Sequence, residues 1–311
     1  MATKRSSVPF TLGLAAILAI IPLAWWLFLR EPPSPPLPPK PPPVAKVDAG
    51  PLQRELKLAE VSGAVEVRRG LDGGWAPAEE GTTLSPSDGV RTTNGSYAVL
   101  VGDEYWEVRM ESGTEVGIGE LSESISRLLL ERGMARAQVK GSGRHTFEVR
   151  AAASDAVAST DAGVFTMATN GLGTVAVGAE SGEVVFAGGG RVVIVKAGQQ
   201  SLMKPGQAPS EPEPIPSSLL LKVALPMRAT LNTPKVVVKG SAQPGAMVEV
   251  QGVVVPVDAE GRFESTVTLK EGLNQVEVRA KGVGNTSAGS KHGLELDTTV
   301  KAPVIDKDLW K

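Results

Sequence analysis

The chain has 311 residues, and its 32 lysines and arginines against 34 aspartates and glutamates give a formal net charge of −2. This balance argues against a nucleic-acid binder, which normally carries a basic face. There is no cysteine and there are only two histidines, which excludes a disulfide framework, thiolate chemistry and a Cys/His zinc site.

The N-terminal segment is predicted to be a transmembrane helix. Residues 6–29 are uncharged, and an apolar run of about 20 residues is long enough to cross a bilayer. We therefore expect a cytoplasmic tail over 1–9 and a helix over 10–29, with Trp25 and Trp26 as interfacial membrane anchors. The basic N-terminus predicts a single-pass protein of a bacterial inner membrane, with its bulk in the periplasm. The alternative, a cleaved signal peptide, lacks a small-residue cleavage site here.

A proline-rich linker is predicted over residues 30–52. Nine of the thirteen residues in 31–43 are prolines, which favours an extended polyproline II stalk. The alternative is a PxxP ligand for an aromatic groove.

The next region, residues 53–205, shows the alternation of apolar and polar residues that is typical of short strands separated by turns. Asn94-Gly95, Asn170-Gly171 and 188–190 are predicted turns. Residues 120–137 allow two interpretations: a helix, or two strands joined by a turn at Gly133. Val175 and its neighbours are expected in one strand, and residues 183–186 in a separate one.

The order of motifs in this region resembles a FecR domain. The residues that carry the resemblance are Gly63-Ala64-Val65, Trp75, Gly81, Leu84, Asp88, Val90-Arg91-Thr92, Gly95-Ser96, Gly133, Phe147-Glu148-Val149, Ser181-Gly182-Glu183-Val184-Val185 and Ala197-Gly198-Gln199-Gln200. Ser87 stands where the family usually has glycine before the aspartate. The resemblance implies a solenoid-like stack of short β-strands.

A second linker is predicted over 206–218, followed by strands over 219–304 and a tail over 305–311. The strand region resembles a bacterial Ig-like domain of the kind appended to glucodextranase. The residues that carry this resemblance are Gly240, Pro244-Gly245-Ala246, Val248-Glu249-Val250, Gly252, Val257-Asp258, Gly261-Arg262-Phe263 and Gly272-Leu273-Asn274. The fold expected overall is all-β: a FecR-like domain and an Ig-like β-sandwich, preceded by one transmembrane helix.

Few residues suggest chemistry. His145 and His292 lie far apart beside turn glycines and are expected to be solvated loop residues. Adjacent carboxylates on a strand point to opposite faces, so no acid–base pair is expected. The aromatic residues that could form a ligand or partner platform, as an alternative to core packing, are Trp75, Tyr97, Tyr105 and Trp106. We predict no catalytic, cofactor-binding or metal-binding residue, and no enzyme.

The expected function is that of an anchored periplasmic scaffold or sensor that binds a periplasmic or outer-membrane protein or another envelope ligand, and no nucleic acid. The FecR resemblance implies an alternative, a transmembrane relay that regulates a sigma factor. The tail over 1–9 is too short to bury a core, which argues against direct sigma-factor binding. A second alternative is binding to peptidoglycan or another glycan.

Overall fold

The computed structural model describes residues 56–102, 105–141, 145–225 and 230–299, together with Pro22, Trp25 and Trp26. The chain divides into a unit of Met1–Ala49 and a compact unit of Gly50–Lys311. In the first unit the three described residues are helical and exposed. Among the described residues no helix has both the length and the apolar character needed to cross a membrane. The rest of the predicted span 10–29, the linker 30–52 and the tail 305–311 lie outside the described residues.

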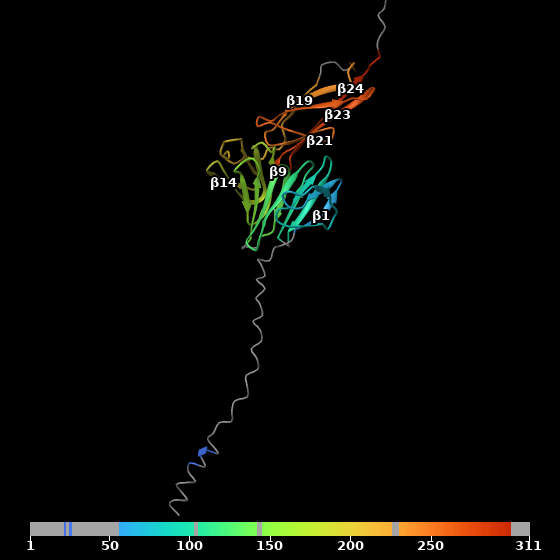
Figure 1. The fold of residues 1–311 in the computed structure, drawn as a ribbon. Coiled ribbons are helices and arrows are strands. Elements are labelled where there is room, and N and C mark those ends of the chain that lie inside the picture. Colours follow the sequence, from blue (N-terminus) through green and yellow to red (C-terminus); the bar gives the residue numbers. More distant parts are fainter. Residues whose placement is uncertain are drawn as a thin grey trace, which may run out of the picture. The chain divides into compact units, whose positions relative to one another are not determined.

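The second unit is built almost wholly from strands, which confirms the all-β class (Figure 1). Two hydrophobic cores divide it into an N-lobe, residues 56–214, and a C-lobe, residues 219–296. The predicted division at 53–205 and 219–304, and the Ig-like identity of the second part, stay predictions.

Two mostly antiparallel sheets face each other in the N-lobe. Sheet A contains, in spatial order, β4 (Thr83–Leu84), β1 (Leu56–Ser62), β6 (Tyr97–Gly102), β7 (Trp106–Met110), β9 (Ile125–Val139), β12 (Gly163–Thr169), β13 (Val175–Gly188), β15 (Gln199–Met203) and β16 (Glu213–Pro214). Sheet B contains β3 (Trp75–Pro77), β2 (Val65–Arg68), β5 (Gly89–Thr92), β8 (Glu115–Leu121), β9, β10 (Thr146–Ala151), β11 (Val157–Thr160), β13 and β14 (Arg191–Lys196).

Strands β9 and β13 belong to both sheets, because each bends at a glycine and crosses from one sheet to the other. Gly133 in β9 has φ of 93°, and Gly182 in β13 has φ of 75°, conformations that glycine adopts at little cost. The helical interpretation of 120–137 is therefore wrong. Gly133 is a bend inside one strand rather than a turn between two, and the two strands expected over 174–186 are one.

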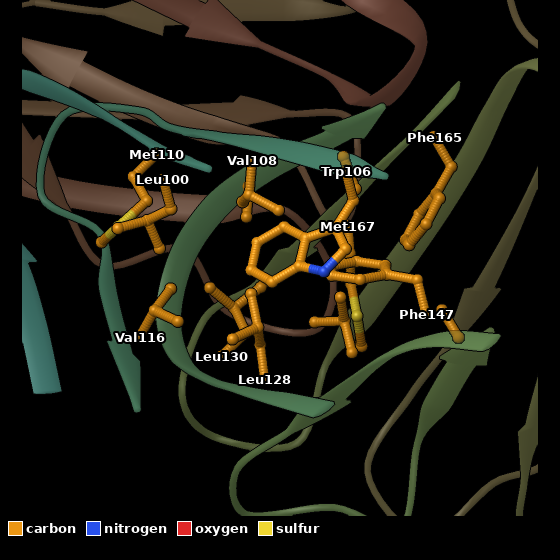
Figure 2. Packing of buried hydrophobic residues seen from close by; sticks show 14 of the residues in the cluster. Leu100, Trp106, Val108, Met110, Val116, Leu128, Leu130, Phe147, Phe165 and Met167 are labelled. Carbon is orange, nitrogen blue, oxygen red and sulfur yellow. The ribbon is translucent and has the colours of Figure 1, made fainter. Parts of the chain in front are cut away.

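The N-lobe core lies between the two sheets and is centred on aromatic and sulfur-containing side chains. Figure 2 shows Trp106 packed among Val108, Phe147, Phe165 and Met167. The rings of Trp106 and Phe147 lie 4.9 Å apart, within the range of favourable aromatic pairs. Alternating strand residues from both sheets fill the remaining volume, as the period-two pattern predicts.

The motif residues at the start of the N-lobe serve local structure. The Asp88 carboxylate accepts hydrogen bonds from the backbone N–H groups of Gly70 and Ser85 and from the Arg69 guanidinium. Ser87 has φ of 76°, which explains why a glycine would suit that position. The Thr92 hydroxyl donates to the carbonyl of Glu111. The motif therefore stabilises the turns at the start of the N-lobe.

The C-lobe contains two sheets around its own core. One is ordered β17 (Leu221–Ala224), β19 (Lys235–Ala242) and β22 (Arg262–Thr268). The other is ordered β18 (Thr230–Leu231), β24 (Ser287–Leu296), β23 (Gly272–Lys281), β20 (Met247–Val250) and β21 (Val253–Val255). The short 3₁₀ segment η1 (Val283–Asn285) joins β23 to β24.

The segment predicted as a second linker, 206–218, lies along the N-lobe. Its strand β16 pairs with β15, and the Ile215 N–H donates to the carbonyl of Gly198. The Ser201 hydroxyl donates to the carbonyl of Ser210. The segment therefore joins the lobes while its own backbone is hydrogen bonded.

Candidate binding cleft

A cleft of about 550 Å³ lies between the N-lobe and the C-lobe, within the unit Gly50–Lys311. Its size falls in the range of ligand-binding clefts, roughly 300–1,000 Å³. Its walls come from β2 and β5, from the bend in β9, from the turns after β5 and β12, and from the segments around β20 and β21.

Two asparagines in turns of the N-lobe reach the C-lobe side of the cleft. The Asn94 side-chain oxygen accepts a hydrogen bond from the Val254 N–H at 3.1 Å. The Asn170 side-chain oxygen accepts from the N–H groups of Leu172 and Thr174, and its amide nitrogen donates to the carbonyl of Val257 at 3.0 Å. Both asparagines precede glycine. The Asn-Gly dipeptide predicts a turn, but it does not predict the hydrogen bond that each asparagine makes to the C-lobe.

The C-lobe wall is mostly apolar. It contains the edge strand β21, and Met247 and Pro256 line it as well. From the N-lobe, Leu172 adds a side chain that is 68% exposed. A cleft with one apolar wall and a few fixed polar groups is the usual form of a binding site.

The charged residues of the cleft are paired. Arg91 donates to Glu66 at 2.5 Å, Arg132 binds Glu115 at 3.0 Å, and Asp258 accepts from Arg262 at 2.7 Å. The backbone N–H of Arg262, more than its guanidinium, lowers the pKa of Asp258. Because each charge has a local partner, the cleft is close to neutral.

A separate apolar cluster lies between the lobes. Met134, Ala168 and Ala176 of the N-lobe are buried together with Val283 of the C-lobe. Beside it, the Lys281 ammonium lies 2.6 Å from the Glu111 carboxylate. This cluster fixes the spacing of the two walls, since apolar surface that separates must be hydrated.

The four aromatic residues for which a platform was the alternative to core packing have separate sets of contacts. Trp106 is 3% exposed, and its N–H donates to the Ser126 hydroxyl. Tyr97 and Tyr105 lie at opposite ends of the β6–β7 hairpin. Tyr97 carries the Arg109 guanidinium over its ring, whereas the Tyr105 ring stacks on His145.

Trp75 contacts a residue that lines the cleft. Its half-buried ring has the guanidinium of Arg91, a cleft residue, 4.4 Å from its centroid and that of Arg68 at 5.1 Å. Cation–π contacts of this kind orient the arginine. Trp75 therefore supports the cleft wall through Arg91 and is itself outside the lining.

The histidines differ from the expectation of solvated loops. His145 is 4% exposed, and its ring nitrogens lie 3.1 Å from the Glu123 carbonyl and 3.0 Å from the Ser126 hydroxyl. The Glu123 carbonyl can only accept, so Nδ1 of His145 donates to it, while the Ser126 hydroxyl that accepts from Trp106 lies at Nε2. His292 lies in β24, within reach of the Ser290 hydroxyl. The sequence contains no pattern that predicts the hydrogen bond between Ser126 and His145.

In the part of the chain that the structure describes, no group of three or more histidines and carboxylates is placed to hold a metal ion. The absence of a cofactor and of enzymatic activity stays a prediction.

Comparisons with known proteins find partial similarity in structure. No protein family and no curated protein matches the chain by sequence. Two crystal structures of a proposed anti-sigma factor from Parabacteroides distasonis ATCC 8503 are similar at 17% and 16% identity, with TM-scores of 0.36 and 0.37. They cover 40% and 47% of this chain, which spans 59% and 68% of theirs. A polysaccharide lyase matches at 11% identity and a TM-score of 0.20, over 77% of this chain and 40% of the lyase.

Proposed function

We propose that this chain is a non-enzymatic binding protein that is anchored in a bacterial inner membrane and binds a segment of a protein partner in the cleft between its two β-lobes. The observation that carries the proposal is the cleft itself, with a mostly apolar wall opposite two fixed asparagines.

The chemistry of the cleft favours an uncharged, partly apolar segment. Its charged side chains are already paired, so a charged ligand would have to compete with Glu66, Glu115 or Arg262 for its contacts. The Thr174 hydroxyl, which belongs to the lining, is buried and has no hydrogen-bond partner among the described residues. Buried polar groups normally have a partner, so this hydroxyl is a candidate contact for a bound backbone group after a small local opening.

The proposed anchoring and location derive from the sequence. The uncharged run 6–29, with Trp25 and Trp26 near its end, would hold the chain in the membrane, and the proline-rich linker 30–52 would space the lobes from it. Because the chain has no cysteine, single engineered cysteines and a membrane-impermeant thiol reagent can test which side of the membrane the lobes occupy.

Two alternatives rest on other observations. A relay to a sigma factor is suggested by the FecR-like motif, whose Asp88 and Thr92 are tied into the turns of the N-lobe. Glycan binding would call for exposed aromatic rings at the site. No aromatic side chain is among the described residues that line the cleft, which makes glycan binding the weaker alternative.

Site-specific photo-cross-linking in cells tests the proposal. A photoreactive amino acid replaces Leu172 in the full chain, and the control carries it at Leu273, which is 89% exposed and outside the cleft. We expect one or two envelope proteins attached at position 172 and absent at 273. Equal labelling at both positions, or labelling at 172 by glycan fragments only, would contradict a protein-binding cleft.

A further inference from the structure

The terminal strand of sheet B, β14 (Arg191–Lys196), has one edge without a strand partner among the described residues (Figure 1). Between the charged end residues Arg191 and Lys196, its exposed side chains are apolar: Val192 is 62% exposed and Ile194 is 51% exposed. On the neighbouring strand β13, Val185 lies opposite Ile194 and is exposed as well. Natural proteins normally protect such an edge with charges, proline or a covering segment, because it can pair with another strand.

The backbone direction at this edge follows from one hydrogen bond. The Lys196 N–H donates to the side-chain oxygen of Gln199 at 3.1 Å, so it points away from β13. In an antiparallel pair the backbone groups of alternate residues point to the same side. The N–H and C=O groups of Val192 and Ile194 therefore also point to the free edge.

At both ends of β14, other groups of the chain occupy the free edge. Gln199 occupies the N–H of Lys196 at one end. At the other end the Arg191 side chain binds the carbonyl of Pro209 and the carboxylate of Glu211, and Gly189 packs against Ala208. A pairing strand is thus limited to the short stretch around Val193.

We propose that β14 pairs antiparallel with β14 of a second copy of the chain, with the two-fold axis at Val193. In this register Val192 lies opposite Ile194 of the partner subunit, and Ile194 lies opposite the partner's Val192. The two pairs exchange backbone hydrogen bonds, because these are the residues whose groups point outward. The two β-sheets would become one continuous sheet.

The sequence around Val193 is self-complementary in this register. Arg191 lies opposite the partner's Val195, and Lys196 lies opposite the partner's Gly190, so no like charges face each other. A shift of two residues leaves one apolar pair instead of two, since it places Ile194 opposite Gly190 or Val192 opposite Lys196. A shift of one residue would place the buried face of one strand beside the exposed face of the other, because side chains alternate between the two faces of a strand. These are the reasons for a second copy over an unrelated partner strand.

Disulfide formation between engineered cysteines tests the proposed register directly. Across the two-fold axis, Val193 faces its own counterpart in a non-hydrogen-bonded pair, with Cα atoms about 4.5 Å apart. That separation suits a disulfide. In the same register, Val195 is four residues out of step with its counterpart, about 13 Å along the strand. Both side chains are buried and face inward, so Val195→Cys is a matched control for Val193→Cys.

Under mild oxidation of the full chain, which has no other cysteine, we expect Val193→Cys to form covalent dimers at least tenfold more than Val195→Cys. Equal cross-linking of the two variants would overturn the register. Attachment of a different protein at Val193→Cys would overturn the second copy in favour of an unrelated strand.

Sedimentation of the full chain in detergent provides the second measurement. Ile194→Lys should raise the dimer dissociation constant at least tenfold, because a lysine at an edge opposes pairing. Val237→Lys is the control, since Val237 is similarly exposed but lies in β19, which is paired on both sides. A monomeric wild-type chain, or a dimer that Ile194→Lys leaves unchanged, would overturn the proposal.

Discussion

Replacing Asp88 with asparagine tests the account of the turns at the start of the N-lobe. Asp88 is 6% exposed, and its two oxygens have different donors. One oxygen accepts from the Gly70 N–H at 2.9 Å, and the other accepts from the Ser85 N–H at 3.0 Å and from Arg69 at 2.7 Å. An asparagine has a single acceptor oxygen, so in either orientation its NH₂ group faces at least one N–H donor.

The expected cost follows from these bonds. A buried hydrogen bond to a charged group contributes about 1.5–3 kcal/mol. The ion pair with Arg69 adds little, because the arginine side chain is 57% exposed. We expect Asp88→Asn to lower the free energy of unfolding by about 2–3 kcal/mol. Asp258→Asn is the control: one oxygen of Asp258 accepts both backbone bonds, so asparagine can keep them. Its effect should be clearly smaller than that of Asp88→Asn.

The pH dependence gives a second signature. Burial raises the pKa of Asp88, but the N–H groups of Gly70 and Ser85 and the Arg69 guanidinium outweigh burial and hold the pKa below its ordinary value of 3.8. The ionised carboxylate therefore stabilises the fold above about pH 4, and this contribution is lost as the pH falls through the folded-state pKa. Asparagine does not titrate, so the difference between wild type and variant should shrink below pH 4.

Urea unfolding, followed by tryptophan fluorescence, to which the buried Trp106 contributes, and by circular dichroism, measures both effects over a pH series from 7 to 2.5. A difference at pH 7 that is no larger for Asp88→Asn than for Asp258→Asn would refute the geometric reasoning. A difference that stays constant down to pH 2.5 would refute the electrostatic part.

Three further substitutions test local geometry by the same unfolding measurement. Ser87→Gly should raise stability by about 0.5–1 kcal/mol, because Ser87 has a positive φ that glycine adopts freely; a loss would contradict this. Gly133→Ala should lower stability by at least about 2 kcal/mol, since a Cβ there would lie 2.5 Å from the Thr114 hydroxyl oxygen; a neutral result would argue against the bend. Ser126→Ala should cost about 2–4 kcal/mol because it leaves Trp106 and His145 without their buried partner, and an unchanged midpoint would contradict that network.

Local patterns predicted much of the secondary structure. The alternation expected over 53–205 is found, for example, in β7, and Gly95 and Gly171 adopt the positive φ expected of turn residues. By contrast, β24 (Ser287–Leu296) is glycine- and serine-rich and shows little alternation, so its strand form depends on pairing with β23 along its whole length. This pairing joins residues from 6 to 24 positions apart, from Lys281 with Ser287 to Gly272 with Leu296, which is more than a short local window contains.

The cleft was harder to predict for the same reason. Asn94 and Asn170 were expected as turn residues, but their bonds to Val254 and Val257 join positions 160 and 87 residues apart. The passage of β9 and β13 between sheet A and sheet B also depends on tertiary contacts. Alternation indicates which face of a strand is buried, but it does not indicate which sheet the strand joins. For Trp106 the structure shows core packing, the interpretation set against a binding platform.

The central claim is that a partner is held in the cleft between the lobes. Leu172→Arg places a charge on the exposed wall of the cleft, whereas Leu273→Arg makes the same change outside it. The direct measurement is in-cell cross-linking of the full-length wild type and both variants, followed by mass spectrometry of the attached proteins. The account predicts that one or two envelope proteins dominate with wild type and Leu273→Arg, and fall at least tenfold with Leu172→Arg. The same proteins at undiminished yield with Leu172→Arg would contradict it.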